Sequence, residues 1–279
     1  MHRMQKKKAR EWQVRLSEEI RHDKTAHFVT LTLSNESYKE LDILINDDIR
    51  GYERENEIAK VATRRFLERW RRKHKKSIKH WFATELGSNG TENIHIHGLI
   101  WTDKEEEINN IWQYGHVFIG DYVNEKTINY IVKYINKIDQ NHKEYNSKIL
   151  TSAGIGKKYI DRFDAKVNKF KQRETDETYK NRQGFRLALP IYYRNKIYSE
   201  EEREKHWIEK LDKNKRFVLG NEYKTSTNEG IKEYLKALKE AQRLNKRLGF
   251  GDDKKDWERE KYEEQIREIL RLKRIENKK

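Results

Sequence analysis

The sequence predicts an α+β fold, with helices packed on a central antiparallel β-sheet. Apolar residues recur at helical spacing in some segments and alternate one by one in others, and the two kinds of segment are interleaved through residue 138. The turn signal Gly87-Ser88-Asn89-Gly90 lies between two strand-like segments. It favours an antiparallel hairpin with a loop of about five residues.

Each element has a local signal. We expect helices over residues 9–22, 53–76, 104–113 and 124–138, and strands over residues 27–34, 79–86, 93–101 and 115–123. In the first helix, Trp12, Leu16 and Ile20 stand four apart and therefore share one face. The first strand is rich in β-branched and aromatic residues, and Phe28 and Thr30 alternate with apolar neighbours.

The remainder of the chain is more polar. Residues 139–183 are loop-rich, and Pro190, the only proline, lies between residues 185 and 198. Beyond residue 199 charged helices dominate, one over residues 231–241 and a weaker one over residues 262–273. We therefore predict a domain of residues 1–198 and a charged helical C-terminal extension of residues 199–279. A partner-binding domain is the alternative for the extension, but its charge favours solvated helices.

The composition favours a nucleic-acid partner. Lys and Arg number 62 against 47 Asp and Glu, which gives a net charge of +15 and a pI of about 9.6. Such a field attracts polyanions. Aromatic residues make up 11% of the chain, and aromatic rings among basic residues suit single strands, whose bases stack on them. A soluble protein that is merely basic is the alternative.

Two absences narrow the class of protein. The chain has no cysteine, which excludes disulfides and thiolate metal sites, so His and carboxylate would hold any metal. No apolar run approaches the ~20 residues that cross a membrane, and the basic start of the chain lacks the apolar stretch of a secretory signal. We expect a cytoplasmic protein with no membrane partner.

The pair His95 and His97 is the most informative feature. Residues two apart on a strand share a face, so both imidazoles point the same way, which leaves Ile94, Ile96 and Leu99 to pack elsewhere. Two imidazoles on a rigid strand provide half of a metal site if a neighbouring element supplies a third ligand. The alternative is a strand with two polar residues on its solvent face.

Glu85 is the expected third ligand. It lies on the strand paired with the His strand and shares a face with Trp81 and Ala83, so it is expected near His95 or His97. Two neutral imidazoles and one carboxylate suit Mg²⁺ or Mn²⁺ and leave positions for phosphate oxygens. A glutamate exposed to water at the end of a hairpin is the alternative.

A second pattern is the repeat Tyr130-x-x-Lys133-Tyr134-x-x-Lys137. On a helix, the two tyrosines are neighbours on one face and the two lysines form a second pair. One interpretation is an amphipathic helix with half-buried tyrosines and solvated lysines. The other makes the phenolic oxygens nucleophiles toward a phosphodiester, assisted by a divalent metal and a lysine, because a free tyrosine is a poor nucleophile at neutral pH.

Taken together, the motifs resemble those of HUH endonucleases, the rolling-circle replication initiators. Three motifs appear in that family's order: Phe28-Val29-Thr30-Leu31-Thr32, His95-Ile96-His97 and the tyrosine–lysine repeat. The detail is similar to the replication initiators of microviruses, especially the gokushovirus branch, in which two tyrosines are spaced by four. The resemblance covers roughly residues 9–198.

This resemblance implies an HUH endonuclease fold and a strand-transfer mechanism. One tyrosine cuts a single-stranded viral DNA origin, which leaves a 5′-phosphotyrosine link and a free 3′-OH that primes a host polymerase; the other tyrosine cuts the regenerated origin. The chain has no Gly-x-x-x-x-Gly-Lys-Ser/Thr loop, so a helicase would come from the host. The implied location is the cytoplasm of a bacterial host cell.

The basic segments are then expected to follow the DNA backbone. The predicted DNA-binding residues are Lys6, Lys7, Lys8, Arg10, Thr30, Thr32, Arg71, Arg72, Lys157 and Lys158. Two other functions stay open: another HUH strand-transfer enzyme, such as a plasmid initiator or transposase-like protein, and a non-enzymatic nucleic-acid-binding protein whose His pair is structural. The second leaves the order of three motifs to chance.

Overall fold

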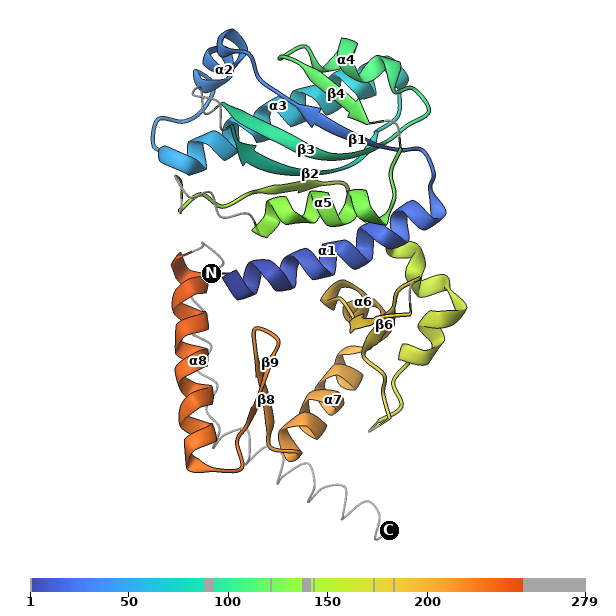
Figure 1. The fold of residues 1–279 in the computed structure, drawn as a ribbon, viewed down its shortest axis with the longest axis vertical. Coiled ribbons are helices and arrows are strands. Elements are labelled where there is room, and N and C mark those ends of the chain that lie inside the picture. The colour runs from blue at the N-terminus through green and yellow to red at the C-terminus, as the bar shows by residue number, and fades with distance from the viewer. Residues whose placement is uncertain are drawn as a thin grey trace. The chain divides into compact units, whose positions relative to one another are not determined.

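A computed structural model (Figure 1) describes residues 2–87, 93–120, 122–136, 142, 144–172, 174–182 and 184–247. The chain divides into two compact units, Met1–Glu209 and Lys210–Lys279. Among the described residues, no helix combines the length and apolar character needed to cross a membrane.

The first unit is built on a five-stranded sheet in the order β4-β1-β3-β2-β5, in which every pairing is antiparallel. Its strands are β1 (Ala26–Leu31), β2 (Lys79–Leu86), β3 (Ile94–Trp101), β4 (Val117–Gly120) and β5 (Ile149–Thr151). The α+β class and the antiparallel pairing of β2 with β3 are confirmed, while residues 88–90 of the predicted turn lie outside the described residues.

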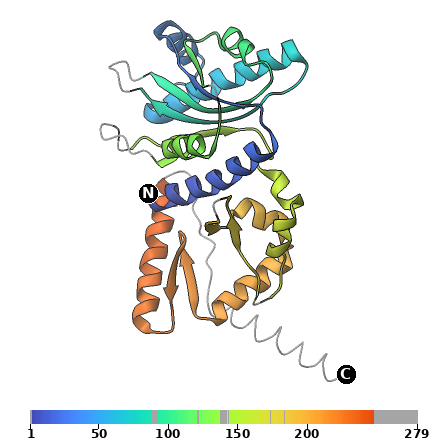
Figure 2. The same ribbon diagram turned by 45° about the vertical axis from the view of Figure 1, so that its right-hand side comes forward.

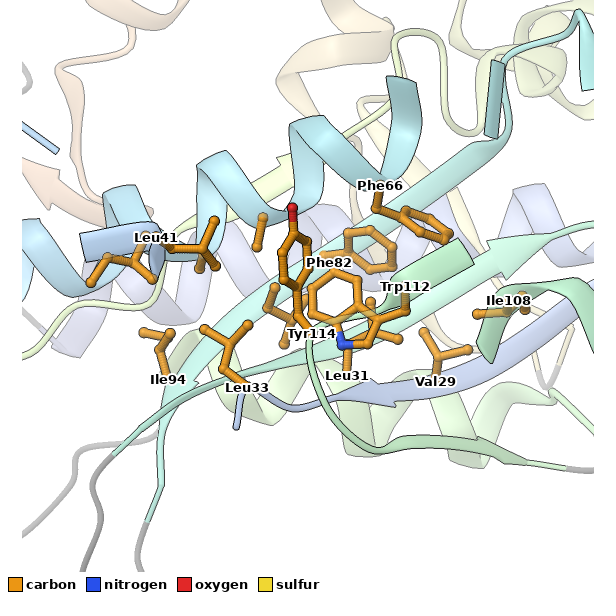
Figure 3. Close-up of a cluster of buried hydrophobic side chains, with 14 of the residues drawn as sticks. Val29, Leu31, Leu33, Leu41, Phe66, Phe82, Ile94, Ile108, Trp112 and Tyr114 are labelled. Atoms are coloured by element: carbon orange, nitrogen blue, oxygen red, sulfur yellow. The ribbon is translucent and has the colours of Figure 1, made fainter. Parts of the chain in front are cut away.

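One face of this sheet is covered by α2 (Asn35–Asp42), α3 (Gly51–His74) and α4 (Glu106–Trp112). Alternation places Val29, Leu31 and Phe82 on this face, where they pack with Phe66 of α3 and Trp112 of α4 (Figure 3). All five side chains are fully buried. This apolar layer fixes the strands, and consequently fixes which side chains emerge on the opposite face.

Helices α1 (His2–His22) and α5 (Glu125–Asn136) cover the opposite face, so the sheet stands between α3 and the α1–α5 pair (Figures 1 and 2). The two helices run in opposite directions, and Gln13 Nε2 donates to Asn129 Oδ1 over 2.6 Å. Leu16, Trp81 and Leu99 are buried between them and the sheet. Leu99 therefore packs on the face of the His pair, not away from it, as its odd position in β3 requires.

A third apolar cluster lies on the other side of α1. Val14 packs there with Tyr159, Tyr179 and Tyr193, and Glu18, 1% exposed, accepts a hydrogen bond from the Tyr179 hydroxyl over 2.6 Å. The elements involved are two 3₁₀ helices (Lys157–Asp161 and Phe163–Asn168), β6 (Thr178–Lys180), β7 (Arg186–Ala188) and α6 (Ile191–Ile197). The segment predicted as loop-rich thus contains short elements, stabilised by contacts with α1.

Polar contacts fix this segment and α1 more firmly. Arg162 Nη1 lies 2.5 Å from Glu18 Oε1, and the backbone N–H of Gly156 donates to Glu19 over 2.6 Å. Lys79, at the start of β2, pairs with Glu19 and with Asp23 over 2.6 and 2.7 Å. Helix α1 is therefore the element that joins the sheet to residues 155–198.

Beyond residue 199 the structure is not wholly helical. Helices α7 (Glu200–Asp212) and α8 (Asn228–Arg247) are separated by a hairpin of β8 (Lys215–Val218) and β9 (Asn221–Lys224), which the sequence did not predict. Leu219 and Gly220 form its two-residue turn with φ of 52° and 83°. Two-residue hairpins favour such a pair but normally use Asn-Gly, so Leu219 concealed the signal. The helix predicted over residues 262–273 lies outside the described residues.

Candidate active site between the sheet and helix α5

The side chains of Glu85, His95 and His97 share one face of two adjacent strands. In the register of β2 and β3, Glu85 stands opposite His95 and Ala83 opposite His97. The carboxylate nevertheless reaches diagonally, and Glu85 Oε2 lies 2.8 Å from His97 Nε2. The predicted proximity of Glu85 to the His pair therefore exists in the folded chain, with His97 as its contact.

His97 occupies a nearly closed environment. It is 8% exposed, and its Nδ1 lies 3.0 Å from the hydroxyl oxygen of Thr30 on β1. Its Nε2 is buried and makes no hydrogen bond among the described residues, so the nearby carboxylate does not meet hydrogen-bond geometry. A buried nitrogen without a hydrogen bond is costly in a protein interior and is frequent at functional sites.

His95 is held close to its neutral form. Burial, helped by nearby His97, lowers the pKa of His95, and the charge of Glu85 only partly opposes this. The ring centroids of His95 and His97 lie 6.2 Å apart. No group of three or more His, Cys, Asp or Glu side chains in the described part of the chain is already arranged to hold a metal ion.

Helix α5 brings the two tyrosines to the His pair. Asn124 caps this helix, since its Oδ1 accepts from the backbone N–H groups of Lys126 and Thr127 over 2.8 and 3.1 Å. The stripe of Ile128, Ile131, Val132 and Ile135 is buried against the sheet and α1. With that stripe fixed, Tyr130 and Tyr134 emerge together beside β3 and β1.

The tyrosines contact one another and the imidazole. The Tyr134 ring stacks on the His97 ring with centroids 4.3 Å apart and planes 1° apart, and its hydroxyl donates to the Tyr130 oxygen over 2.6 Å. Burial, the bond to Tyr130 and the charge of Glu85 together raise the pKa of Tyr134 well above its usual value. Tyr130 is 49% exposed. Glu85, His97, Tyr134 and Tyr130 thus form one continuous cluster.

The lysines of α5 differ in what the structure describes. Lys133 is exposed, whereas Lys137 lies outside the described residues. Lys126 is also exposed and stands four residues before Tyr130, on the same side of the helix. The sequence analysis missed Lys126, although its i–4 spacing from Tyr130 was a usable signal.

The predicted DNA-binding residues are distributed over several surfaces. On α1, Lys7 and Arg10 are exposed, and burial lowers the pKa of Lys8; the Lys6 side chain lies outside the described ones. Lys157 and Lys158 are exposed on the segment beyond α1. Because α1 and α5 run in opposite directions, the first turns of α1 lie toward the Tyr134 end of α5 (Figure 1).

The remaining predicted residues have other surroundings. Arg71 and Arg72 are exposed near the end of α3, which covers the sheet face opposite the His pair, so the structure does not bring them to the cluster. Thr30 contacts His97, as described above. The Thr32 hydroxyl donates to the carbonyl oxygen of His116 over 3.0 Å.

Comparison with known proteins agrees with this site. Residues 26–139 match the family model of the replication-associated protein ORF2. The matched segment runs from β1 through α5 and contains Glu85, His95, His97, Tyr130 and Tyr134. No curated protein and no solved structure matches the chain. The family match supports a replication initiator of the rolling-circle class.

Proposed function

We propose that this protein nicks and rejoins single-stranded DNA at a replication origin, and so starts and ends rolling-circle replication. The observation that carries the proposal is the contact of two tyrosine hydroxyls with each other and of the Tyr134 ring with His97. Phenolic oxygens beside a partly buried imidazole and carboxylate are suited to phosphoryl transfer, in which the tyrosine keeps the phosphate after cleavage.

We assign a divalent ion, Mg²⁺ or Mn²⁺, to Glu85, His95 and His97. The carboxylate is 2.8 Å from His97 Nε2, which makes no hydrogen bond among the described residues. With metal–nitrogen bonds of about 2.1 Å, two imidazoles on one ion can have ring centroids up to about 6.5 Å apart, and those of His95 and His97 are 6.2 Å apart. Rotation of side chains that share one sheet face would complete the set. When bound, the ion would withdraw charge from the scissile phosphate.

The chemistry of this chain is then a transfer of one bond. The phenolic oxygen attacks phosphorus, the Tyr–O–P bond forms and the P–O3′ bond breaks; the phenolic proton leaves to solvent and the 3′ oxygen takes up a proton. We assign the first attack to Tyr130, because it is half exposed and accepts a hydrogen bond from Tyr134. That bond stabilises negative charge on the attacking oxygen. Lys133, exposed on the same helix, is placed to approach a phosphate.

The second cut falls to Tyr134 after one round of replication. Because the tyrosine–phosphate bond conserves the energy of the phosphodiester, the free 3′-OH closes the circle without ATP. We extend the proposal to a microvirus-like initiator, on the spacing of Tyr130 and Tyr134, acting in the cytoplasm of a bacterial host with its polymerase and helicase.

The decisive experiment is covalent trapping. The full chain is incubated with labelled single-stranded origin-region DNA and Mn²⁺, and the adduct is resolved on a denaturing gel. Wild type is expected to form it, and Tyr130→Phe is expected to lower first-round cutting more than Tyr134→Phe. The control Tyr122→Phe changes an exposed tyrosine of the same connection and is expected to behave as wild type. An adduct formed by the double Tyr130→Phe, Tyr134→Phe variant would disprove the nucleophile assignment.

Metal binding is tested without reference to cleavage. Titration of free Mn²⁺ by electron paramagnetic resonance should show one tight site in wild type and its loss in His97→Ala. Equal Mn²⁺ affinity in both proteins would refute the ligand assignment, while an adduct formed equally well in a chelator would refute metal dependence.

Salt dependence distinguishes the alternatives further. If about six basic residues contact single-stranded phosphates, the slope of log K against log salt is about −4. Binding with this slope but without any adduct would favour the non-enzymatic nucleic-acid-binding protein. Adducts on plasmid or transposon ends but not on phage origins would favour another HUH strand-transfer enzyme.

A further inference from the structure

A row of side chains crosses the sheet from its edge to the His pair. In the register of the strands, Phe118 of β4 stands opposite Thr30 of β1, and Thr30 stands opposite His97 of β3. Residues in such a row project from the same face of the sheet. Adjacent strands lie about 4.8 Å apart, so the backbone of Phe118 is about 10 Å from that of His97.

Phe118 has no place in the core. Its neighbours Val117 and Ile119 point to the opposite face and pack against the α3 cluster, whereas Phe118 is 50% exposed. β4 is an edge strand of the sheet. Exposure of a large aromatic ring on an edge strand is unfavourable in water unless a partner covers it.

The exposed ring continues directly into the tyrosine pair. Phe118 contacts Phe28 edge-on with ring centroids 6.1 Å apart, and Phe28 contacts Tyr130 in the same way at 6.1 Å. Gly120, opposite Phe28, adds no side chain over these rings; a Cβ there would lie 3.4 Å from Phe28 and 3.8 Å from Phe118. A shallow aromatic floor therefore leads from the sheet edge to Tyr130.

Positive charge borders this floor on α5. Lys126 and Lys133 are both exposed and stand four residues before and three residues after Tyr130, so the three side chains lie on neighbouring positions of one helix face. An aromatic surface beside a line of cations is the arrangement that binds single-stranded nucleic acid, with bases on the rings and phosphates at the lysines. Apolar partners such as a second protein chain would not use those charges.

We propose that Phe118 is a stacking platform for a base of the DNA strand that is cut, with Lys126 and Lys133 binding the flanking phosphates. This rests on the proposed function and adds a nucleotide subsite to it. A nucleotide advances about 3.4 Å along a stacked strand and more when extended, so the stacked base lies within about three nucleotides of the scissile phosphate.

The test compares binding of one probe, a fluorescein-labelled 20-nucleotide thymidine oligonucleotide, to the full chain over a salt series. Stacking on one aromatic ring corresponds to about 5- to 150-fold in affinity. Phe118→Leu, which keeps an apolar side chain but removes the ring, is expected to raise Kd by that factor at every salt concentration without changing the salt slope. Phe118→Tyr should stay within about twofold of wild type, because the ring is kept.

Two controls complete the design. Phe185→Leu removes another exposed ring, 66% exposed and on a different segment, and should leave Kd unchanged. Lys126→Ala should flatten the salt slope by about 0.7, a change that loss of a ring does not produce. Far-UV circular dichroism and thermal melting verify that each variant is folded.

The outcomes separate this inference from the nuclease itself. Unchanged Kd in Phe118→Leu, or wild type that does not bind the oligonucleotide, overturns the stacking platform. Loss of self-association in Phe118→Leu with unchanged Kd would assign the ring to a contact between copies of the chain and also overturn it. If no tyrosine adduct forms in the trapping experiment but Phe118→Leu weakens binding, the nuclease fails and the platform stands.

Discussion

Gly98, directly after His97, is the position where one added methyl group should do the most damage. A Cβ built on Gly98 would lie 2.1 Å from the carbonyl oxygen of Trp81 and 2.8 Å from the Cα of Phe82. Both are backbone atoms of β2, the strand paired with β3. No rotamer change relieves such contacts, so in Gly98→Ala the two strands must separate locally by about 1 Å.

The magnitude follows from this geometry. Overpacking a tight interior costs about 1–3 kcal/mol, and contact with paired backbone sets the upper end, about 3 kcal/mol. For a unit of this size that lowers the melting temperature by about 6–12 °C. The same shift moves His97 away from Glu85, now 2.8 Å apart, and metal–ligand distances tolerate only about 0.2 Å. Mn²⁺ binding is therefore expected to be lost even where the variant remains folded.

Thermal unfolding followed by tryptophan fluorescence, together with the Mn²⁺ titration, measures both effects. The matched control is Gly120→Ala in the same sheet, where a Cβ meets nothing closer than 3.4 Å. Reduced freedom of the unfolded chain should make that variant as stable as wild type or up to about 1 kcal/mol more stable. Gly98→Ala with wild-type stability and Mn²⁺ affinity would show that β2 and β3 are not packed as described.

Three further predictions test other parts of the first unit. Glu18→Gln leaves the Arg162 guanidinium without its buried anionic partner and should cost about 3 kcal/mol, detected as proteolytic cleavage within residues 155–198 at concentrations of protease that spare wild type. Thr30→Val removes the hydroxyl beside the candidate metal-binding imidazole and should weaken Mn²⁺ binding about 10- to 100-fold, whereas Thr32→Val should not; equal affinities would argue against this positioning role. Burial alone would raise the pKa of Asp23, but hydrogen bonds from its lysine and threonine partners outweigh it and hold the pKa below its usual value; its stabilising effect is therefore complete above about pH 3.9 and lost as pH falls below it, so the urea midpoint should fall less steeply between pH 5 and pH 2 in Asp23→Asn than in wild type.

The central sheet was predictable because its signals are local. The expected strand over residues 79–86 coincides with β2, and β3 begins one residue after its expected start. Alternation then assigns Glu85, His95 and His97 to one face without any knowledge of the partner helix. What alternation lacks is the diagonal reach of a side chain, which is why Glu85 contacts His97 although its backbone partner is His95.

The missing elements have weak local signals and strong distant contacts. α2 is only eight residues long, with one fully buried side chain, Leu41. β5 has three residues and forms only by pairing with β2. The segment beyond residue 155 folds because Arg162 and Tyr179 meet Glu18, more than 140 positions earlier in the chain. Contacts over such separations leave no periodicity for sequence analysis to detect.

Phe118 shows where periodicity ends and topology begins. The strand over residues 115–123 was expected, and alternation would have separated Phe118 from Val117 and Ile119. It would not have told which set faces the His pair, because that depends on β4 pairing with β1 at the sheet edge, about 90 residues earlier in the chain. Only this register turns a surface phenylalanine into the end of an aromatic row that reaches Tyr130 through Phe28. Residues that contact the substrate away from the reacting atoms are therefore the hardest to predict, since no motif spacing fixes them.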